Sequence, residues 1–247
     1  MDISNEQYSQ HISRQFNQEL EGLKTNLMAM GGLVEKQLAD ALTALLERDG
    51  ALAEQVRQQD HDVNEMQLKI DDESTEIIAR RQPAASDLRL VIAVIRTASD
   101  LERIGDEADK IARHALALLG GKETDRGITE IRRIGTQVRT MVRNALTAFA
   151  RFDTQLALDV RRADTDVDQE YKSALRSLAT FMMEDSSSIT SVIDVMWVLR
   201  ALERIGDHAD NLAESVVYLV KGLDLRHSNR RDLDEKDLDD NTLSSYK

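Results

Sequence analysis

The sequence predicts an all-α protein made of two tandem, quasi-equivalent three-helix bundles, with six long helices in all. Three observations support this fold class. The 247 residues include one proline, eleven glycines and 4% aromatic residues, a composition that favours helix over sheet. Apolar residues recur at intervals of three and four, which is the period of an amphipathic helix. The third observation is an internal repeat of roughly one hundred residues, which indicates a duplicated unit rather than a short solenoid module.

The repeat is clearest in a stretch of nine residues. Residues 101–109 read LERIGDEAD and residues 202–210 read LERIGDHAD, so the copies differ only where Glu107 and His208 stand. Upstream, residues 41–44 and 145–148 both read ALTA, an offset of 104. Agreement over such separated segments indicates that the whole unit is duplicated.

The first repeat is expected to hold three helices. The first spans about 12–46, and the Gly31-Gly32 pair indicates a bend or a close contact with another helix. The second runs over about 51–80 after an Asp49-Gly50 turn. It stops before Pro83, because the residue preceding a proline resists the α conformation.

Capping residues then place the third and sixth helices. Ser86 or Asp87 is expected to cap the third helix, which ends near Gly120. The serines at 186–188 are expected to form the corresponding cap cluster in the second repeat. The predicted divisions are a first repeat at 1–121, a second repeat at 122–225 and a disordered charged tail at 226–247.

Charge and composition narrow the classes of function. A net charge of −13 and a pI near 4.9 argue against non-specific nucleic-acid binding, which needs a basic face. The absence of cysteine excludes thiolate metal sites and disulfides. The polar N-terminus lacks the apolar core of a signal peptide, and no apolar run approaches the ~18 residues of a spanning helix. We therefore expect a cytoplasmic protein that reaches a membrane only through a partner.

Carboxylates line one edge of each repeated stretch. Glu102, Asp106 and Asp109 fall at i, i+4 and i+7 beside a stripe of small residues that includes Gly105 and Ala108, at which a neighbouring backbone could approach closely. Stacked like charges repel each other, and a hard cation with oxygen ligands, such as Mg²⁺, Ca²⁺, Mn²⁺ or iron, would compensate. The alternative is a solvated acidic face.

The second helix of each repeat adds a polar pair at i, i+4 beside its apolar stripe. If the helices pack antiparallel, each repeat gathers its polar side chains at one cation cluster. The predicted metal ligands are Asp60, Asn64, Glu102, Asp106 and Asp109 in the first repeat, and Asp164, Asp168, Glu203, Asp207 and Asp210 in the second.

Other chemistries find little support in the sequence. The acidic stripes lack the Glu-x-x-His pairs of a di-iron protein, and the chain has neither a phosphate-binding P-loop nor a nucleophile elbow. Arg103 and Arg204 could hold phosphate near a metal, or could form plain ion pairs. His208 is either an auxiliary ligand or a surface histidine. No catalytic residue is predicted.

Several segments of the chain resemble the PhoU family, the accessory and regulatory proteins of the bacterial phosphate-specific transport system. The matching segments are MGGLVE at 30–35, IARRQPAASDLR at 78–89, both ERIGD motifs, FMMED at 181–185 and KGLDLRH at 221–227. Glu102, Asp106, Glu203 and Asp207 match the family's E-x-x-x-D motif, and geometry extends it to Asp109 and Asp210. The first cluster departs from the second at Asn64, which stands opposite Asp168.

The resemblance implies a non-catalytic regulator with metal clusters of iron, manganese, magnesium or zinc. It also implies a homodimer that acts between the phosphate ABC transporter ATPase subunit and a sensor histidine kinase. Such a protein damps phosphate uptake and represses phosphate-starvation signalling. Two other interpretations remain: a metal-dependent phosphoester or polyphosphate hydrolase, and a purely structural helical adaptor that binds no metal.

Overall fold

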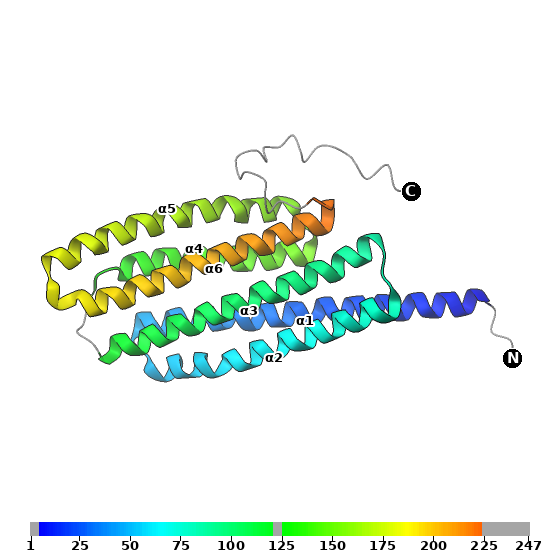
Figure 1. Ribbon diagram of the computed structural model, residues 1–247, viewed down its shortest axis with the longest axis horizontal. Helices are drawn as coiled ribbons and strands as arrows, with labels where there is room; N and C mark the ends of the chain where they lie inside the picture. Colours follow the sequence, from blue (N-terminus) through cyan, green and yellow to red (C-terminus); the bar gives the residue numbers. More distant parts are fainter. Residues whose placement is uncertain (1–4, 121–124, 224–247) are drawn as a thin grey trace.

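Six long helices make up the computed structural model, which describes residues 5–120 and 125–223, with side chains from residue 14 onward (Figure 1). Within these ranges the chain contains no β-strand. The all-α prediction is therefore confirmed. The helices are α1 (Asn5–Glu47), α2 (Gly50–Arg81), α3 (Ala85–Gly120), α4 (Ile128–Arg151), α5 (Thr154–Glu184) and α6 (Ile189–Lys221), with a 3₁₀ turn, η1 (Ser186–Ser188), before α6.

The helices form two bundles in tandem, as the repeat predicts. Helices α1, α2 and α3 pack on one another, as do α4, α5 and α6, while α3 meets α6 and α1 meets α4 between the bundles. Within the described ranges, α2 and α5 contact only helices of their own bundle. One continuous cluster of buried apolar side chains runs through both bundles. The predicted boundary at 121/122 and the predicted tail at 226–247 both lie outside the described residues.

Helices α3 and α6 run antiparallel and side by side through the middle of the molecule (Figure 1). Two cross-helix contacts define this register. His114 Nδ1 of α3 lies 3.0 Å from Asp194 Oδ1 of α6, and His208 Nδ1 of α6 lies 3.0 Å from Asp100 Oδ1 of α3. The repeated acidic stretches therefore lie on central helices that touch each other.

The contact between α1 and α4 is reciprocal. A β-carbon placed on Gly31 would lie 2.5 Å from Leu146 Cδ2, and one placed on Gly135 would lie 3.0 Å from Leu42 Cδ1. Each glycine and each leucine has its counterpart 104 residues away, so the two bundles present the same surface to each other. The sequence prediction of a close contact at the glycine pair is confirmed for Gly31, whereas Gly32 has open space around it.

The N-terminal caps of α2 and α5 are equivalent at the same offset of 104 residues. Asp49 accepts a hydrogen bond from the backbone N–H of Leu52 at 3.0 Å, and Asp153 accepts one from Leu156 at 3.0 Å. Each aspartate satisfies an N–H group that the first helical turn leaves unpaired, which typically stabilises a helix by ~1 kcal/mol. The same short joint therefore connects the first two helices of each bundle.

Three helix ends differ from the sequence prediction. α1 begins at Asn5 rather than near residue 12. Residues 5–12 contain no glycine or proline, and the backbone hydrogen bonds of a helix can form where the sequence has no apolar stripe. α3 begins at Ala85, one residue before the predicted caps, and Asp87 lies in its first turn. In the second repeat, the predicted Ser188 is the N-cap residue of α6, but its side chain makes no capping hydrogen bond. Asp185 accepts one from Ser187 N at 3.0 Å and so caps the 3₁₀ turn η1. The predicted stop before Pro83 is confirmed, since α2 ends at Arg81.

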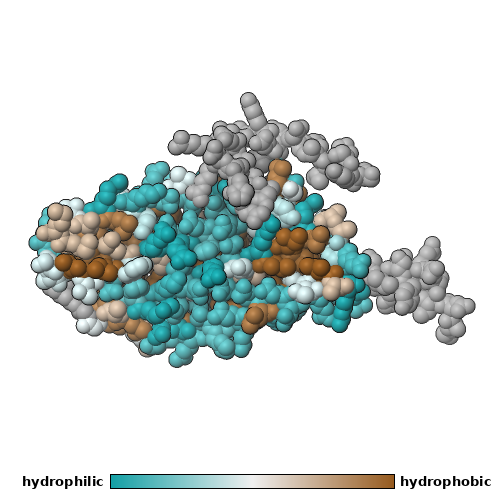
Figure 2. Space-filling model, in the orientation of Figure 1, coloured by the Kyte–Doolittle hydropathy of each residue, from teal (hydrophilic) through white to brown (hydrophobic). Residues whose placement is uncertain are grey.

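The surface is hydrophilic over the middle of the face in Figure 2, with apolar areas toward both ends. Where α5 passes into α6, the exposed apolar side chains are Met183, Ile189, Ile193 and Trp197. None of the described helices is both long enough and apolar enough to traverse a bilayer.

Candidate metal centres

The first candidate site is built around Gly105 of α3. A β-carbon at this position would lie 3.1 Å from Gln37 Oε1 of α1 and 3.5 Å from Asp60 Oδ1 of α2. The absence of a side chain on Gly105 therefore lets polar groups of two neighbouring helices reach the α3 backbone between Glu102 and Asp106. The small residues of this stripe predict the close approach of a neighbouring backbone, but polar side chains and Val63 fill the space.

The second candidate site repeats this arrangement around Gly206 of α6. A β-carbon there would lie 3.2 Å from Asp164 Oδ1 of α5 and 3.7 Å from Met141 Cε of α4. Asp164 is almost completely buried, and Glu203 is only 9% exposed. The position equivalent to Gln37 is Met141. The two sites therefore share a glycine and an aspartate, but α1 contributes Gln37 to the first site and α4 contributes Met141 to the second.

Burial and like charges disfavour the ionised carboxylates of both sites. Burial raises the pKa of Glu102 above its ordinary value of 4.5, and the neighbouring Asp106 carboxylate raises it further. Glu203 shows the same pattern, with its pKa raised by burial and then by Asp207. The pKa of Asp60 is raised mainly by burial, against which the hydrogen bond from Gln37 acts. A bound cation would offset this cost of holding several carboxylates together.

The polar pair on α2 is joined by a hydrogen bond, since Asn64 Nδ2 donates to Asp60 Oδ2 at 3.3 Å. On α5, Asp168 instead forms an ion pair with Lys172 at 3.0 Å. The first site therefore holds three carboxylates and one amide where the second holds four carboxylates. This difference lowers the negative charge of the first site by one.

Asp109 and Asp210 occupy a different environment from the other predicted ligands. Asp109 lies 3.4 Å from Arg57 of α2, and Asp210 lies 3.0 Å from Arg161 of α5. The two arginines are equivalent under the repeat offset, so each bundle joins its second and third helices by the same ion pair. Arg113 also binds Asp109. Both aspartates thus already have cationic partners, which a metal ion would have to displace.

The predicted ligands share one face of each repeat without forming a ready-made cage. Among the described residues, no three His, Cys, Asp or Glu side chains stand close enough together to hold a metal ion. Among the predicted ligands, Asp60 and Asp164 lie closest to the glycines, while Glu102, Asp106, Glu203 and Asp207 follow the edge of α3 and α6. Metal binding at these sites remains a prediction.

The single difference between the nine-residue copies lies at the contact of the two bundles. Glu107 is almost fully buried and pairs with Arg204 and Lys110, both at 2.9 Å. His208 is half-buried against Asp100 rather than on the surface. Arg103 lies 3.4 Å from Glu102 and 3.5 Å from Asp106. Both motif arginines therefore form ion pairs, which is the plainer of their two predicted roles.

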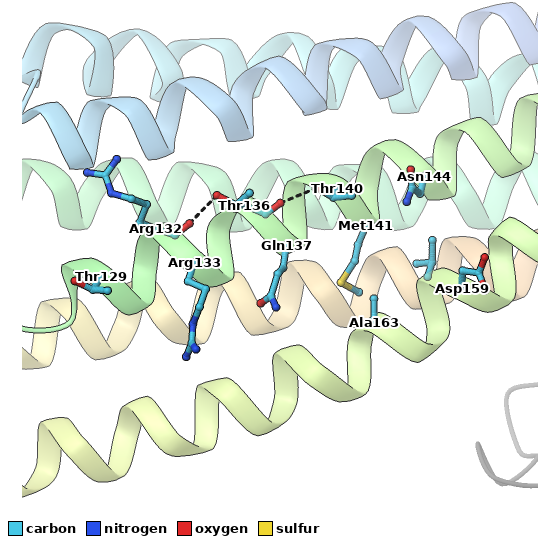
Figure 3. Close-up of a pocket in the computed structure, with 11 residues that line it drawn as sticks. Thr129, Arg132, Arg133, Thr136, Gln137, Thr140, Met141, Asn144, Asp159 and Ala163 are labelled. Carbon is cyan, nitrogen blue, oxygen red and sulfur yellow. Dashed lines mark hydrogen bonds between the residues drawn. The ribbon is translucent and has the colours of Figure 1, made fainter.

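A cavity of about 570 Å³ opens between α4 and α5 (Figure 3). Its wall includes three threonines and an apolar patch of Met141, Val160 and Ala163. Met141 of this wall also lies beside Gly206 of the second candidate site. Arg133, one of the two arginines that line it, is paired with Glu170 at 3.0 Å.

Sequence reasoning missed the buried polar residue of the first site. Gln37 lies within the apolar stripe of α1, between Val34 and Leu38, and is fully buried. An amide in a stripe of aliphatic residues is the signal that identifies such a position. Arg57 and Arg161 were also missed, and their equivalence at an offset of 104 would have found them.

The fold and its sites define a duplicated helical-bundle protein with one acidic cluster in each repeat. A family model described as the PhoU domain matches residues 27–115 and again 131–216. The chain therefore belongs to the PhoU family. Both matches contain one glycine-centred acidic site, so the family domain coincides with the structural repeat.

Relatives and solved structures agree with this assignment. A Pseudomonas putida protein, described as a phosphate-specific transport system accessory protein PhoU homolog, is 59% identical over 225 residues, covering 91% of this chain and 88% of its own length. The Escherichia coli accessory protein PhoU is 45% identical over 92% of this chain and 94% of its own. A crystal structure of PhoU from Pseudomonas aeruginosa is 57% identical with a TM-score of 0.83, covering 84% of this chain and all of that one.

Proposed function

We propose that this protein is a non-catalytic, metal-binding negative regulator of phosphate uptake and of phosphate-starvation signalling. The observation that carries the proposal is the duplicated glycine-centred acidic site inside a chain of the PhoU family. Relatives that cover most of this chain are named as accessory proteins of the phosphate-specific transport system. A related structure from Streptococcus pneumoniae, 30% identical with a TM-score of 0.79, is described as a phosphate transport system regulatory protein.

The residues present suit a hard cation. In the first site Asp60, Glu102 and Asp106 would supply carboxylate oxygens and Asn64 an amide oxygen. Asp164, Asp168, Glu203 and Asp207 would do so in the second. Oxygen ligands of this kind suit magnesium, manganese, iron and zinc to different degrees. When bound, the ion would neutralise the crowded carboxylates and so couple the conformations of the helices that carry them.

Asp109 and Asp210 are proposed as outer members of the two clusters. Their ion pairs with Arg57 and Arg161 hold the second and third helices of each bundle at a fixed register beside the cation. Such residues act on a metal site through orientation of its ligands. We propose that they change metal affinity without being required for binding.

The proposed partners are a second copy of the chain, the ATPase subunit of the phosphate ABC transporter and a sensor histidine kinase. The exposed apolar side chains at the α5–α6 junction, Trp197 among them, support a docking role, since aromatic residues are enriched in interface cores. A cytoplasmic protein with these partners reaches the membrane only through them. Fractionation of cells with and without the transporter and kinase tests this, and persistent membrane binding without either partner would contradict it.

Turnover distinguishes the regulator from a hydrolase built on the same clusters. Metal-loaded protein is incubated with a phosphoester and with polyphosphate, and release of phosphate is measured. We expect no hydrolysis above that of a variant carrying Glu102→Ala, Asp106→Ala, Glu203→Ala and Asp207→Ala. In cells, the same variant should relieve repression of a phosphate-starvation reporter at high phosphate. Hydrolysis that depends on these carboxylates would instead establish the enzyme.

A further inference from the structure

The buried amide of Gln37 distinguishes the first acidic site from the second. Gln37 is fully buried on α1, and its Nε2 donates to Asp60 Oδ1 at 3.4 Å and to the Val56 carbonyl at 3.5 Å. Among the described residues its Oε1 has no hydrogen-bond partner. A buried acceptor left without a donor destabilises the folded state, so such an atom calls for an explanation.

The position of this oxygen supplies one. The point that a β-carbon of Gly105 would occupy lies 3.1 Å from Gln37 Oε1 and 3.5 Å from Asp60 Oδ1. Gly105 lies on α3 between Glu102 and Asp106. The amide oxygen therefore faces the same space as the carboxylate of Asp60. It reaches this space from α1, whereas the carboxylates of the site come from α2 and α3.

The second repeat shows what replaces the amide. Met141 stands 104 residues after Gln37, and its Cε lies 3.7 Å from the corresponding point on Gly206. A thioether is a poor partner for a hard cation, whereas an amide oxygen is a common one. The two sites therefore differ twice, at Gln37 against Met141 and at Asn64 against Asp168.

We propose that Gln37 belongs to the first cation site, where its Nε2 holds Asp60 and its Oε1 is offered to the ion. The inference rests on the proposed cation-binding function and adds a prediction that the repeats are not equivalent. The first site combines three carboxylates with two amide oxygens and binds a divalent cation more weakly. The second combines four carboxylates with an apolar methionine and binds it more tightly.

The two sites can be measured separately with Mn²⁺ on chelator-treated protein, following free Mn²⁺ by electron paramagnetic resonance. A variant with Glu203→Gln and Asp207→Asn removes two carboxylates of the second site, so that binding at the first site can be measured alone. Glu102→Gln with Asp106→Asn does the same for the second site. Gln37→Met, which introduces the residue of the second repeat, should weaken the first site by at least about 10- to 100-fold, the usual effect of losing a residue that orients a metal ligand such as Asp60. It should leave the second site unchanged.

Two further variants separate a role in cation binding from a role in packing. Gln137→Met makes the same exchange on α4 and should leave the first site unchanged. Gln37→Glu keeps the shape but exchanges the Nε2 donor to Asp60 and Val56 for a carboxylate oxygen. It should therefore destabilise the metal-free protein and gain more thermal stability from Mn²⁺ than wild type does. This second variant keeps the test decisive if Gln37→Met folds poorly.

The outcomes are distinguishable. Unchanged first-site affinity in Gln37→Met, or no gain in Gln37→Glu, overturns the role of Gln37 and leaves the cation sites standing. Wild-type protein that binds no Mn²⁺ overturns the proposed cation-binding function, and the role of Gln37 with it. Weaker binding in the first-site background alone, together with the gain in Gln37→Glu, supports the inference.

Discussion

Glu107 of α3 and Arg204 of α6 form an ion pair between the two bundles, with 2.9 Å between the carboxylate oxygen Oε1 and the guanidinium nitrogen Nη1. The glutamate is buried and the arginine is half-exposed. Under the repeat, the position equivalent to Glu107 is His208, which contacts Asp100 of α3. In each copy, the residue that breaks the identity of the two motifs thus contacts the other bundle.

Replacing Glu107 by Gln should therefore destabilise the contact between the bundles. The substitution removes the charge that Arg204 and Lys110 share, and we expect the free energy of unfolding to fall by about 1–3 kcal/mol. Urea unfolding followed by circular dichroism measures the change. Glu65→Gln is the control, because its exposed pair with His61 should contribute less than about 1 kcal/mol. Equal effects of the two variants would mean that the buried pair contributes no more to the free energy of unfolding than an exposed pair does.

The α1–α4 contact offers a matched pair of adjacent glycines. Gly32→Ala has open space and should stabilise the helix by up to about 1 kcal/mol, whereas a β-carbon on Gly31 would meet Leu146 at 2.5 Å. Leu146 is buried and cannot move freely, so Gly31→Ala should be at least about 1 kcal/mol less stable than Gly32→Ala. Thermal or urea unfolding compares the two, and identical stabilities would contradict the close packing at Gly31.

Much of this architecture was predictable because a duplicated sequence repeats its local chemistry. Asp49 and Asp153 cap equivalent helices, and Gly105 and Gly206 each leave space for an aspartate side chain of the neighbouring helix. The offset alone thus located the two acidic stretches on equivalent helices. What periodicity could not supply is which side chains of neighbouring helices face a given residue.

The environments of Asp109 and Gln37 illustrate that limit. Helical spacing places Asp109 on the same stripe as Glu102 and Asp106, yet the approach of α2 pairs it with Arg57. Gln37 is separated from Gly105 by 68 positions, so no local pattern joins them. Both contacts depend on the relative position of packed helices, which is a property of the tertiary structure.

The stability of the chelator-treated protein should depend on pH through the acidic clusters. The pKa values of Asp60, Glu102 and Glu203 are raised in the folded state, above their values in the unfolded chain. The folded state therefore binds these protons more tightly, and the resulting stability is present below the unfolded pKa and lost as pH rises through the folded pKa. Metal-free protein should lose this contribution as the pH rises above the ordinary pKa values of these carboxyls, 3.8 for Asp60 and 4.5 for the two glutamates.

The Glu102→Gln, Glu203→Gln variant tests the pH effect. Its urea midpoint should depend less on pH than that of metal-free wild type, and it should be the more stable of the two at neutral pH. The control Glu54→Gln, an exposed residue paired with Arg57, should keep the wild-type dependence. Parallel pH profiles for wild type and the double variant would assign the pH dependence to other groups.

The metal content of protein purified without chelators tests the central claim most directly. Elemental analysis is made on wild type, on Glu102→Ala with Asp106→Ala, on Glu203→Ala with Asp207→Ala, and on the combined variant, after each is shown to be folded. We predict that the first pair loses the metal of the first repeat, the second pair loses that of the second, and the combined variant carries none. Metal-free wild type, or a combined variant with the wild-type metal content, would contradict the account and leave the acidic stripes as a solvated face.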